Sequence, residues 1–186
     1  MKRLFFVPRF LSLAVFFLIA AYISPVCVSA QATDEPPKDA APPPLTILSK
    51  NEKSQLQLEN NIKKRTKLCM DLMESRLKTA EGLVEQNKFQ ETINELGGFQ
   101  ALLENALNFL ERKDNGGSNT DYNYKRLEIG LRQTVSRLEL VRREMPFQYG
   151  YYVVKLQKFV REARAKAIEP LFGDTVISEN NLQSKN

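Results

Sequence analysis

The stretch FQETINELGGFQALLENALNFLER, residues 89–112, decides the fold. Apolar residues recur in it at alternating steps of four and three, the spacing of a coiled-coil type of helix seam. With Gln100 completing the series, its members are Phe89, Ile93, Leu96, Leu103, Leu107 and Leu110. A second apolar set widens this face, so we expect the helix to touch more than one neighbour; it comprises Phe99, Leu102, Ala106 and Phe109.

Gly97 and Gly98 stand in the middle of this helix. Each glycine costs a helix about 1 kcal/mol relative to alanine. We interpret the pair as a place where another helix approaches closely, with a hinge as the alternative.

A longer helix is predicted before this one, from Ser49 to about Gln86, with a short break at Asn87-Lys88. Ser49-Lys50-Asn51-Glu52 has the residues of a capping box. The helix would be about 57 Å long at 1.5 Å per residue, so it overhangs its neighbours, breaks, or packs on a partner. Cys69 lies on its apolar face and is expected to be buried, whereas the basic run 63–67 is expected to be solvated.

Two further helices are predicted after a flexible loop at residues 114–119, DNGGSN. One runs from about Thr120 to Met145, and the other begins close to Phe147, after Pro146, and ends before Pro170. Four amphipathic helices joined by short connections predict an all-α domain, either an antiparallel four-helix bundle or a set of helical hairpins.

The turn region 80–93, AEGLVEQNKFQETI, resembles the turn between the helices of a tetratricopeptide-type hairpin. A small residue, a leucine, a short turn and an aromatic residue recur there in the same order. The resemblance covers about 14 residues and no 34-residue repeat accompanies it. It therefore implies a generic helical hairpin and assigns no family.

The first thirty residues have the order of an export signal. Basic residues at positions 2, 3 and 9 precede an apolar run over 10–23, and the segment closes on Val28-Ser29-Ala30. The run is shorter than the roughly 20 residues of a membrane-spanning helix. We expect cleavage after Ala30; a lipoprotein processed at Cys27 and an uncleaved anchor are the alternatives. Export to the periplasm or cell envelope of a bacterium follows from this interpretation.

The predicted organisation is a signal peptide at 1–30, a Pro-rich disordered linker at 31–48, a helical domain at 49–172 and a disordered tail at 173–186. Residues 33–44 read TDEPPKDAAPPP, in which five prolines exclude helix. Cleavage of the signal would leave Cys69 as a lone cysteine, so the domain would be held by its core rather than by a disulfide.

Composition argues against several classes of function. The chain has no histidine, so a zinc site and a histidine-based catalytic triad are not expected. Glycine-rich phosphate loops and calcium loops are also absent. Without the three basic residues of the signal, 24 of the 27 Lys and Arg residues remain against 22 acids. This near-neutral balance disfavours nucleic-acid binding. We expect no cofactor and no enzymatic activity, with a carboxylate-based hydrolase as the weakest alternative.

Two surface features remain as candidates for binding. Aromatic residues cluster around Gly150 and offer a partner-binding surface or the core at one end of the domain; they are Phe147, Tyr149, Tyr151 and Tyr152. Residues 120–170 carry 11 basic and 6 acidic side chains. Their arginines either solubilise the helices or meet a membrane surface or an acidic partner.

The sequence therefore predicts an exported helical protein-interaction or scaffold domain whose partner is another envelope protein. The alternative is a structural protein of the membrane or cell wall, anchored by an uncleaved signal. Self-association is also compatible with the helix seams, because they can be completed within one chain or between chains.

Overall fold

The computed structural model describes residues 36–114 and 118–172, and these residues form an all-α fold, as predicted. The expected signal peptide at 1–30 and tail at 173–186 lie outside the described residues, as do residues 31–35 of the expected linker. The helices are α2 (Lys50–Leu58), α3 (Ile62–Glu85), α4 (Phe89–Lys113), α5 (Ser118–Leu131), α6 (Thr134–Glu144) and α7 (Phe147–Phe172). No helix within the described ranges combines the length and apolarity needed to span a bilayer.

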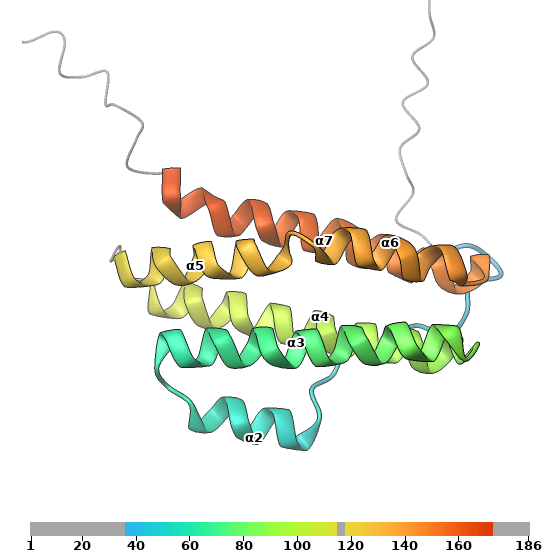
Figure 1. Cartoon of the computed structure of the whole chain (residues 1–186), viewed down its shortest axis with the longest axis horizontal. Coiled ribbons are helices and arrows are strands. Elements are labelled where there is room, and N and C mark those ends of the chain that lie inside the picture. The colour runs from blue at the N-terminus through green and yellow to red at the C-terminus, as the bar shows by residue number, and fades with distance from the viewer. Residues whose placement is uncertain (1–35, 115–117, 173–186) are drawn as a thin grey trace, which may run out of the picture. The chain divides into compact units, whose positions relative to one another are not determined.

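Helices α3 and α4 form a hairpin and pack against each other along their length (Figure 1). The turn between them is closed by Asn87, whose φ of 59° lies in the left-handed region that asparagine tolerates better than most residues. Its backbone N–H donates to the carbonyl of Val84 at 2.9 Å, and that of Lys88 donates to Leu83 at 3.0 Å. The predicted break at residues 87–88 and the predicted hairpin are both present.

Helices α5 and α6 follow one another in one row, and α7 runs back along both (Figure 1). The sequence predicted one continuous helix from 120 to 145, but the structure breaks it at Arg132-Gln133. The Arg132 N–H donates to the Ile129 carbonyl, a tight i→i−3 bond that ends α5. The apolar seam continues across the break, because its members are all buried: Leu127, Leu131, Thr134, Leu138, Val141 and Met145.

Helix α7 also departs from its prediction at its far end. It was expected to end before Pro170 but extends to Phe172. The helix therefore continues through Pro170, although proline has no N–H to donate to the carbonyl four residues earlier.

The predicted first helix, residues 49–86, is broken at residues 59–61, so that α2 folds back beside α3 (Figure 1). Asn61 caps α3 by accepting a bond from the Lys64 N–H at 3.1 Å, and Glu59 Oε1 accepts from the Asn61 N–H at 2.9 Å. The predicted capping box is present. Ser49 Oγ accepts a bond from the Glu52 N–H at 3.2 Å, and Glu52 Oε2 accepts one from the Ser49 N–H at 2.7 Å. Of the three alternatives for the overlong helix, the break is the observed one.

Two arginines of α3 hold α2 in place. Arg76 pairs with Glu52 of α2 at 2.8 Å and with Glu95 of α4 at 2.8 Å. Arg65 donates to the carbonyl of Leu56 and, with its other terminal nitrogen, to Asn105 Oδ1 at 3.1 Å. The prediction that the whole run 63–67 is solvated is wrong for Arg65 and Thr66, which are both buried, whereas the three lysines of the run are exposed.

Residues 36–48, which we call the strap, lie across the ends of several helices (Figure 1). The Ala41 N–H donates to the Gln148 carbonyl at 3.1 Å, and the Ala41 carbonyl accepts from Tyr152 Oη at 2.6 Å. The Leu45 N–H donates to Asn94 Oδ1 at 3.2 Å. This part of the expected disordered linker is irregular, but hydrogen bonds join its backbone to α4 and α7. The number of prolines gave no indication of these bonds.

The two glycines of α4, Gly97 and Gly98, leave room for the strap and for the side chain of Arg76. A Cβ on Gly97 would lie 2.6 Å from the carbonyl oxygen of Leu45, and one on Gly98 would lie 2.9 Å from Cζ of Arg76. The predicted close approach of another helix is not what is observed, because the nearest neighbours of the two glycines are the strap and the Arg76 side chain. Helix α4 runs through both glycines without interruption.

The core lies between α3, α4, α7 and the α5–α6 row. Its largest fully buried side chains include Phe99, Leu102, Leu103, Leu127 and Val160. Helix α4 contacts α3, α5 and α7, so the widened apolar face has several neighbours, as predicted. Cys69 is also fully buried, as predicted, and burial raises the pKa of its thiol to about 11.

Candidate functional site

The predicted aromatic residues lie on the first turns of α7, which begins directly after Pro146. Phe147, Tyr151 and Val154 are spaced i, i+4 and i+7, so they form one stripe along the helix, which we call the α7 stripe. Phe147 is 79% exposed and Val154 is 49% exposed, whereas Tyr151 is half-buried. The stripe borders a hollow of about 210 Å³ whose other lining residues are Pro37, Arg142, Met145 and Gly150.

Tyr149 and Tyr152 turn away from this hollow. The ring of Tyr149 lies 5.7 Å from that of Phe89, and Tyr149 packs against the core. Tyr152 donates to the strap at Ala41. The structure thus separates the four predicted site residues into two that line an open hollow, Phe147 and Tyr151, and two that hold the fold together.

The hollow beside the α7 stripe is apolar with charged neighbours. Lys155 Nζ lies 5.1 Å from the centre of the Tyr151 ring, a cation–π contact. Arg142 forms one wall and is already paired with Glu139 at 2.7 Å. Bonds from Arg142 and then Arg143 hold the pKa of Glu139 far below its usual range. This surface offers area for contact, and its described lining residues include no carboxylate, histidine or cysteine.

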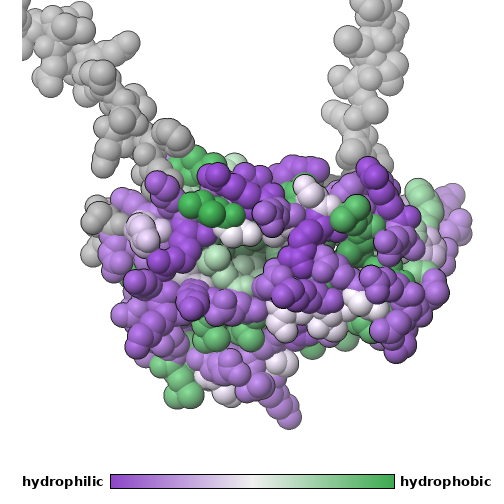
Figure 2. Space-filling view, in the orientation of Figure 1, coloured by the Kyte–Doolittle hydropathy of each residue, from purple (hydrophilic) through white to green (hydrophobic). Residues whose placement is uncertain are grey.

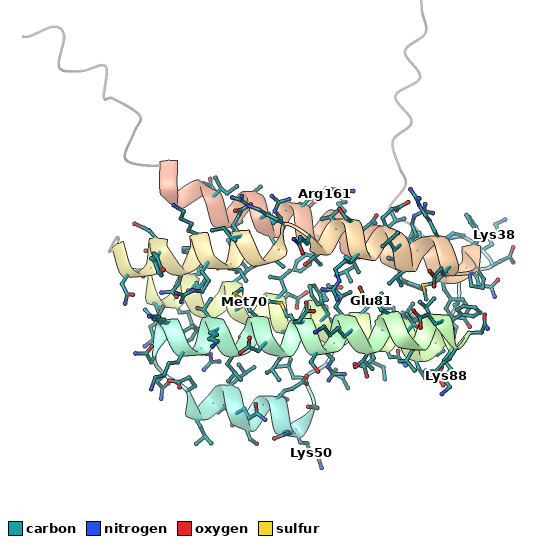
Figure 3. All side chains as sticks on the ribbon, viewed as in Figure 1. Lys38, Lys50, Met70, Glu81, Lys88 and Arg161 are labelled. Carbon is teal, nitrogen blue, oxygen red and sulfur yellow. The ribbon has the colours of Figure 1, made fainter. Side chains whose placement is uncertain are left out.

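The arginines of α5 and α6 are mostly engaged within the molecule. Arg137 bonds to both Glu74 and Glu81 of α3, at 2.6 and 2.7 Å, and Figure 3 shows Glu81 rising from α3 toward the α5–α6 row. Arg132 pairs with Glu128, as Arg142 and Arg143 pair with Glu139. Arg126 is the exception among these five, because within the described residues it has no carboxylate partner.

The buried carboxylates of the described region are also committed to arginines. Glu52 is 7% exposed and Glu128 is 4% exposed, and they belong to separate helices. Burial raises the pKa of Glu52, but bonds from Arg76 and Ser49 outweigh burial and the net shift is downward. The pKa of Glu128 is also lowered, because bonds from Arg132 and Arg164 outweigh the effect of burial, which would raise it. Proton donation needs a raised pKa, so neither carboxyl has the property of a general acid.

Metal chemistry has no obvious ligand set in the described residues. Nowhere in the ranges 36–114 and 118–172 do three or more acidic or cysteine side chains gather at metal-binding distance.

A second hollow lies between α3 and α5, on the face shown in Figure 2, where green and pale side chains lie among purple ones. It measures about 270 Å³ and is lined by Met70, Tyr122, Lys125, Arg126, Ile129 and Gly130. The sequence analysis did not identify it. The available signal was the pair Tyr122 and Ile129, seven residues apart and off the buried seam, both of which are about half exposed.

Comparisons of the chain with protein-family models, curated proteins and solved structures find no match.

Proposed function

We propose that this chain is an exported, non-enzymatic helical domain that binds another protein of the bacterial envelope through the α7 stripe. In this proposal α3, α4, the α5–α6 row and α7 form an antiparallel four-helix bundle that acts as a rigid scaffold. The strap and α2 brace the bundle, and residues 1–30 direct export.

The observation that carries the proposal is the exposure of the α7 stripe. Phe147 is a large aromatic side chain of which 79% is in contact with solvent, beside a hollow of about 210 Å³. Aromatic anchors next to shallow apolar hollows are typical of the residues that dominate protein–protein binding energy. A face of this kind on a helix also suits the packing of a partner helix.

The placement of the charged residues supports a binding role over catalysis. The buried carboxylates Glu52 and Glu128 are paired with arginines. Most arginines of α5 and α6 are likewise paired internally, which favours a protein partner over a broad anionic surface for this half of the domain.

The test places a photo-crosslinking phenylalanine analogue at position 147 in cells, with position 58 as the control. Leu58 is 84% exposed, so it matches Phe147 in exposure but lies on α2. We expect one recurrent envelope protein to be crosslinked at 147 and not at 58. Tyr151→Ala should weaken that crosslink at least about tenfold, since loss of an interface anchor costs 2 kcal/mol or more, while far-UV circular dichroism stays unchanged.

Equal crosslinking at both positions, or a crosslink insensitive to Tyr151→Ala, contradicts the proposal. If the only crosslinked protein is a second copy of this chain, the proposed envelope partner is wrong and the α7 stripe is a surface of self-association. Recovery of residues 1–30 in the mature protein by mass spectrometry contradicts cleavage of the signal and favours the anchored structural alternative.

A further inference from the structure

The hollow between α3 and α5 has features of a small-molecule site that the proposed protein-binding role does not use. Its rim is formed by Tyr122 and Ile129, which are 58% and 49% exposed. These two side chains stand one above the other on α5 and face Met70 of α3. Figure 3 shows Met70 directed from α3 into the space below α5.

Met70 lines this hollow and also a second one. A Cβ on Gly130 would collide with Cε of Met70, so the missing side chain of Gly130 makes the room that the thioether occupies. The second hollow, which we call the inner hollow, measures about 250 Å³ and is also lined by Phe99 and Leu127 of the core. Methionine is unbranched and adapts its shape readily, so Met70 can move without disturbing the helices.

Joined by such a movement, the hollows of about 270 and 250 Å³ reach the range of about 300–1,000 Å³ found for ligand pockets. Both hollows are lined by residues of α3 and α5, which pack against each other.

At the outer end stands a positioned cation that has no carboxylate partner among the residues that the structure describes. Arg126 donates to Asn123 Oδ1 at 3.1 Å, and its guanidinium lies 4.9 Å from the centre of the Tyr122 ring. Asn123 is itself fully buried and donates to the Asn119 carbonyl at 2.7 Å, which orients it. Lys125 lies beside Arg126 and adds a second positive charge.

The inner hollow has the opposite charge at its mouth. Asp71 and Glu74 line it, and Glu74 forms an ion pair with Arg137. An anionic group is therefore favoured at the Arg126 end and disfavoured at the Asp71 end, which gives the site a direction.

We propose that this site binds a free, single-chain amphiphile with an anionic head group. The alkyl chain lies over Gly130 in the space that the Met70 thioether vacates, and the head group accepts bonds from Arg126 with Lys125 close by. Charge complementarity selects the anion, and the apolar side chains of Met70, Ile129 and Leu127 favour an alkyl chain.

The experiment titrates the full-length chain with dodecanoate below its micelle concentration and measures heat by calorimetry. Dodecyltrimethylammonium tests the head-group charge. Arg126→Gln removes the cation, Gly130→Leu fills the exposed hollow, and Arg161→Gln is the matched control, because Arg161 is an exposed arginine of α7, shown away from Met70 in Figure 3. Vesicles of neutral lipid with and without an anionic lipid provide the membrane arm.

We expect one dodecanoate per chain, binding at least about tenfold weaker in Arg126→Gln, lost in Gly130→Leu and unchanged in Arg161→Gln. The ammonium amphiphile should not bind. Absence of dodecanoate binding, equal binding of the two amphiphiles, or equal loss in the Arg126 and Arg161 variants overturns the proposal. Binding to anionic vesicles without binding of free dodecanoate also overturns it, because the head group would then be read on a membrane.

Discussion

Replacing Gly97 by alanine should weaken the protein, although the same change inside a helix usually strengthens it. Alanine favours a helix interior over glycine by about 1 kcal/mol. At Gly97, however, the added Cβ would lie 2.6 Å from the Leu45 carbonyl oxygen, and ordinary contact begins near 3.4 Å. The strap must therefore retreat by about 0.8 Å.

That retreat has an energetic cost that can be bounded. It stretches the 3.2 Å bond from the Leu45 N–H to Asn94 Oδ1 beyond hydrogen-bond range. If the whole strap leaves, the two bonds at Ala41 are lost as well. At about 0.5–1.5 kcal/mol per bond, the loss offsets or exceeds the helical gain, and we expect a net destabilisation of about 1 kcal/mol.

Gly82→Ala is the matched control, because nothing lies within 4 Å of a Cβ at this position of α3. It should stabilise the protein by about 1 kcal/mol. The two variants should then differ by about 2 kcal/mol, or roughly 8 °C in melting temperature for a domain of this size. Thermal and urea unfolding followed by circular dichroism measures the difference, and faster tryptic cleavage after Lys38 in Gly97→Ala locates it in the strap. If both variants stabilise equally, the reasoning about the strap is refuted.

Three further predictions concern the core, an ion pair and the thiol. Leu103→Ala should destabilise by about 2–5 kcal/mol because this side chain is fully buried, whereas Leu140→Ala, 59% exposed, should change urea unfolding by less than about 0.5 kcal/mol. The pKa of Glu52 is lowered in the folded state, so its pairing with Arg76 stabilises the protein above the unfolded pKa and is lost as pH falls through the folded one. In Glu52→Gln the free energy of unfolding should therefore fall less steeply as the pH is lowered. An unchanged slope of the free energy of unfolding against pH would show that the ion pair contributes nothing to stability. Cys69, with a pKa of about 11, should react with a thiol reagent at pH 8 only after unfolding in urea, so rapid labelling of Cys69 itself in the native chain, located by mass spectrometry of its peptide, would contradict its burial.

Most of the helices could be predicted from sequence because their signals are local. The four-three spacing in α4, the capping box at Ser49 and the turn at Asn87 each depend on residues within one or two turns of helix. The burial of Cys69 followed from the same periodicity.

The two unpredicted breaks show where local signals were too weak. At residues 59–61, the side chains of Glu59 and Asn61 accept bonds from the backbone N–H groups two and three residues further on, a competition with helix that is marginal until α2 gains α3 as a neighbour. At Arg132-Gln133 no side chain caps the new helix, so no sequence signal marked it.

The candidate sites depended still more on the tertiary structure. The sequence identified four aromatic residues, but only the contacts of Tyr149 with Phe89 and of Tyr152 with Ala41 separated the two structural residues from Phe147 and Tyr151. The sequence also did not distinguish the arginines of α5 and α6 that form ion pairs within the molecule from those that do not. The pairing of Arg137 with Glu74, 63 residues away in sequence, needed the fold.

The sequence by itself therefore determined that this region is all-helical, where most helices begin and end, and which faces are apolar, since these depend on the period of the helix. The tertiary structure alone decided which residues of the strap are bound, why Gly97 and Gly98 are glycines, and which arginine stays uncompensated beside a hollow. These properties arise from contacts between residues tens of positions apart, and such contacts are set by packing rather than by local pattern.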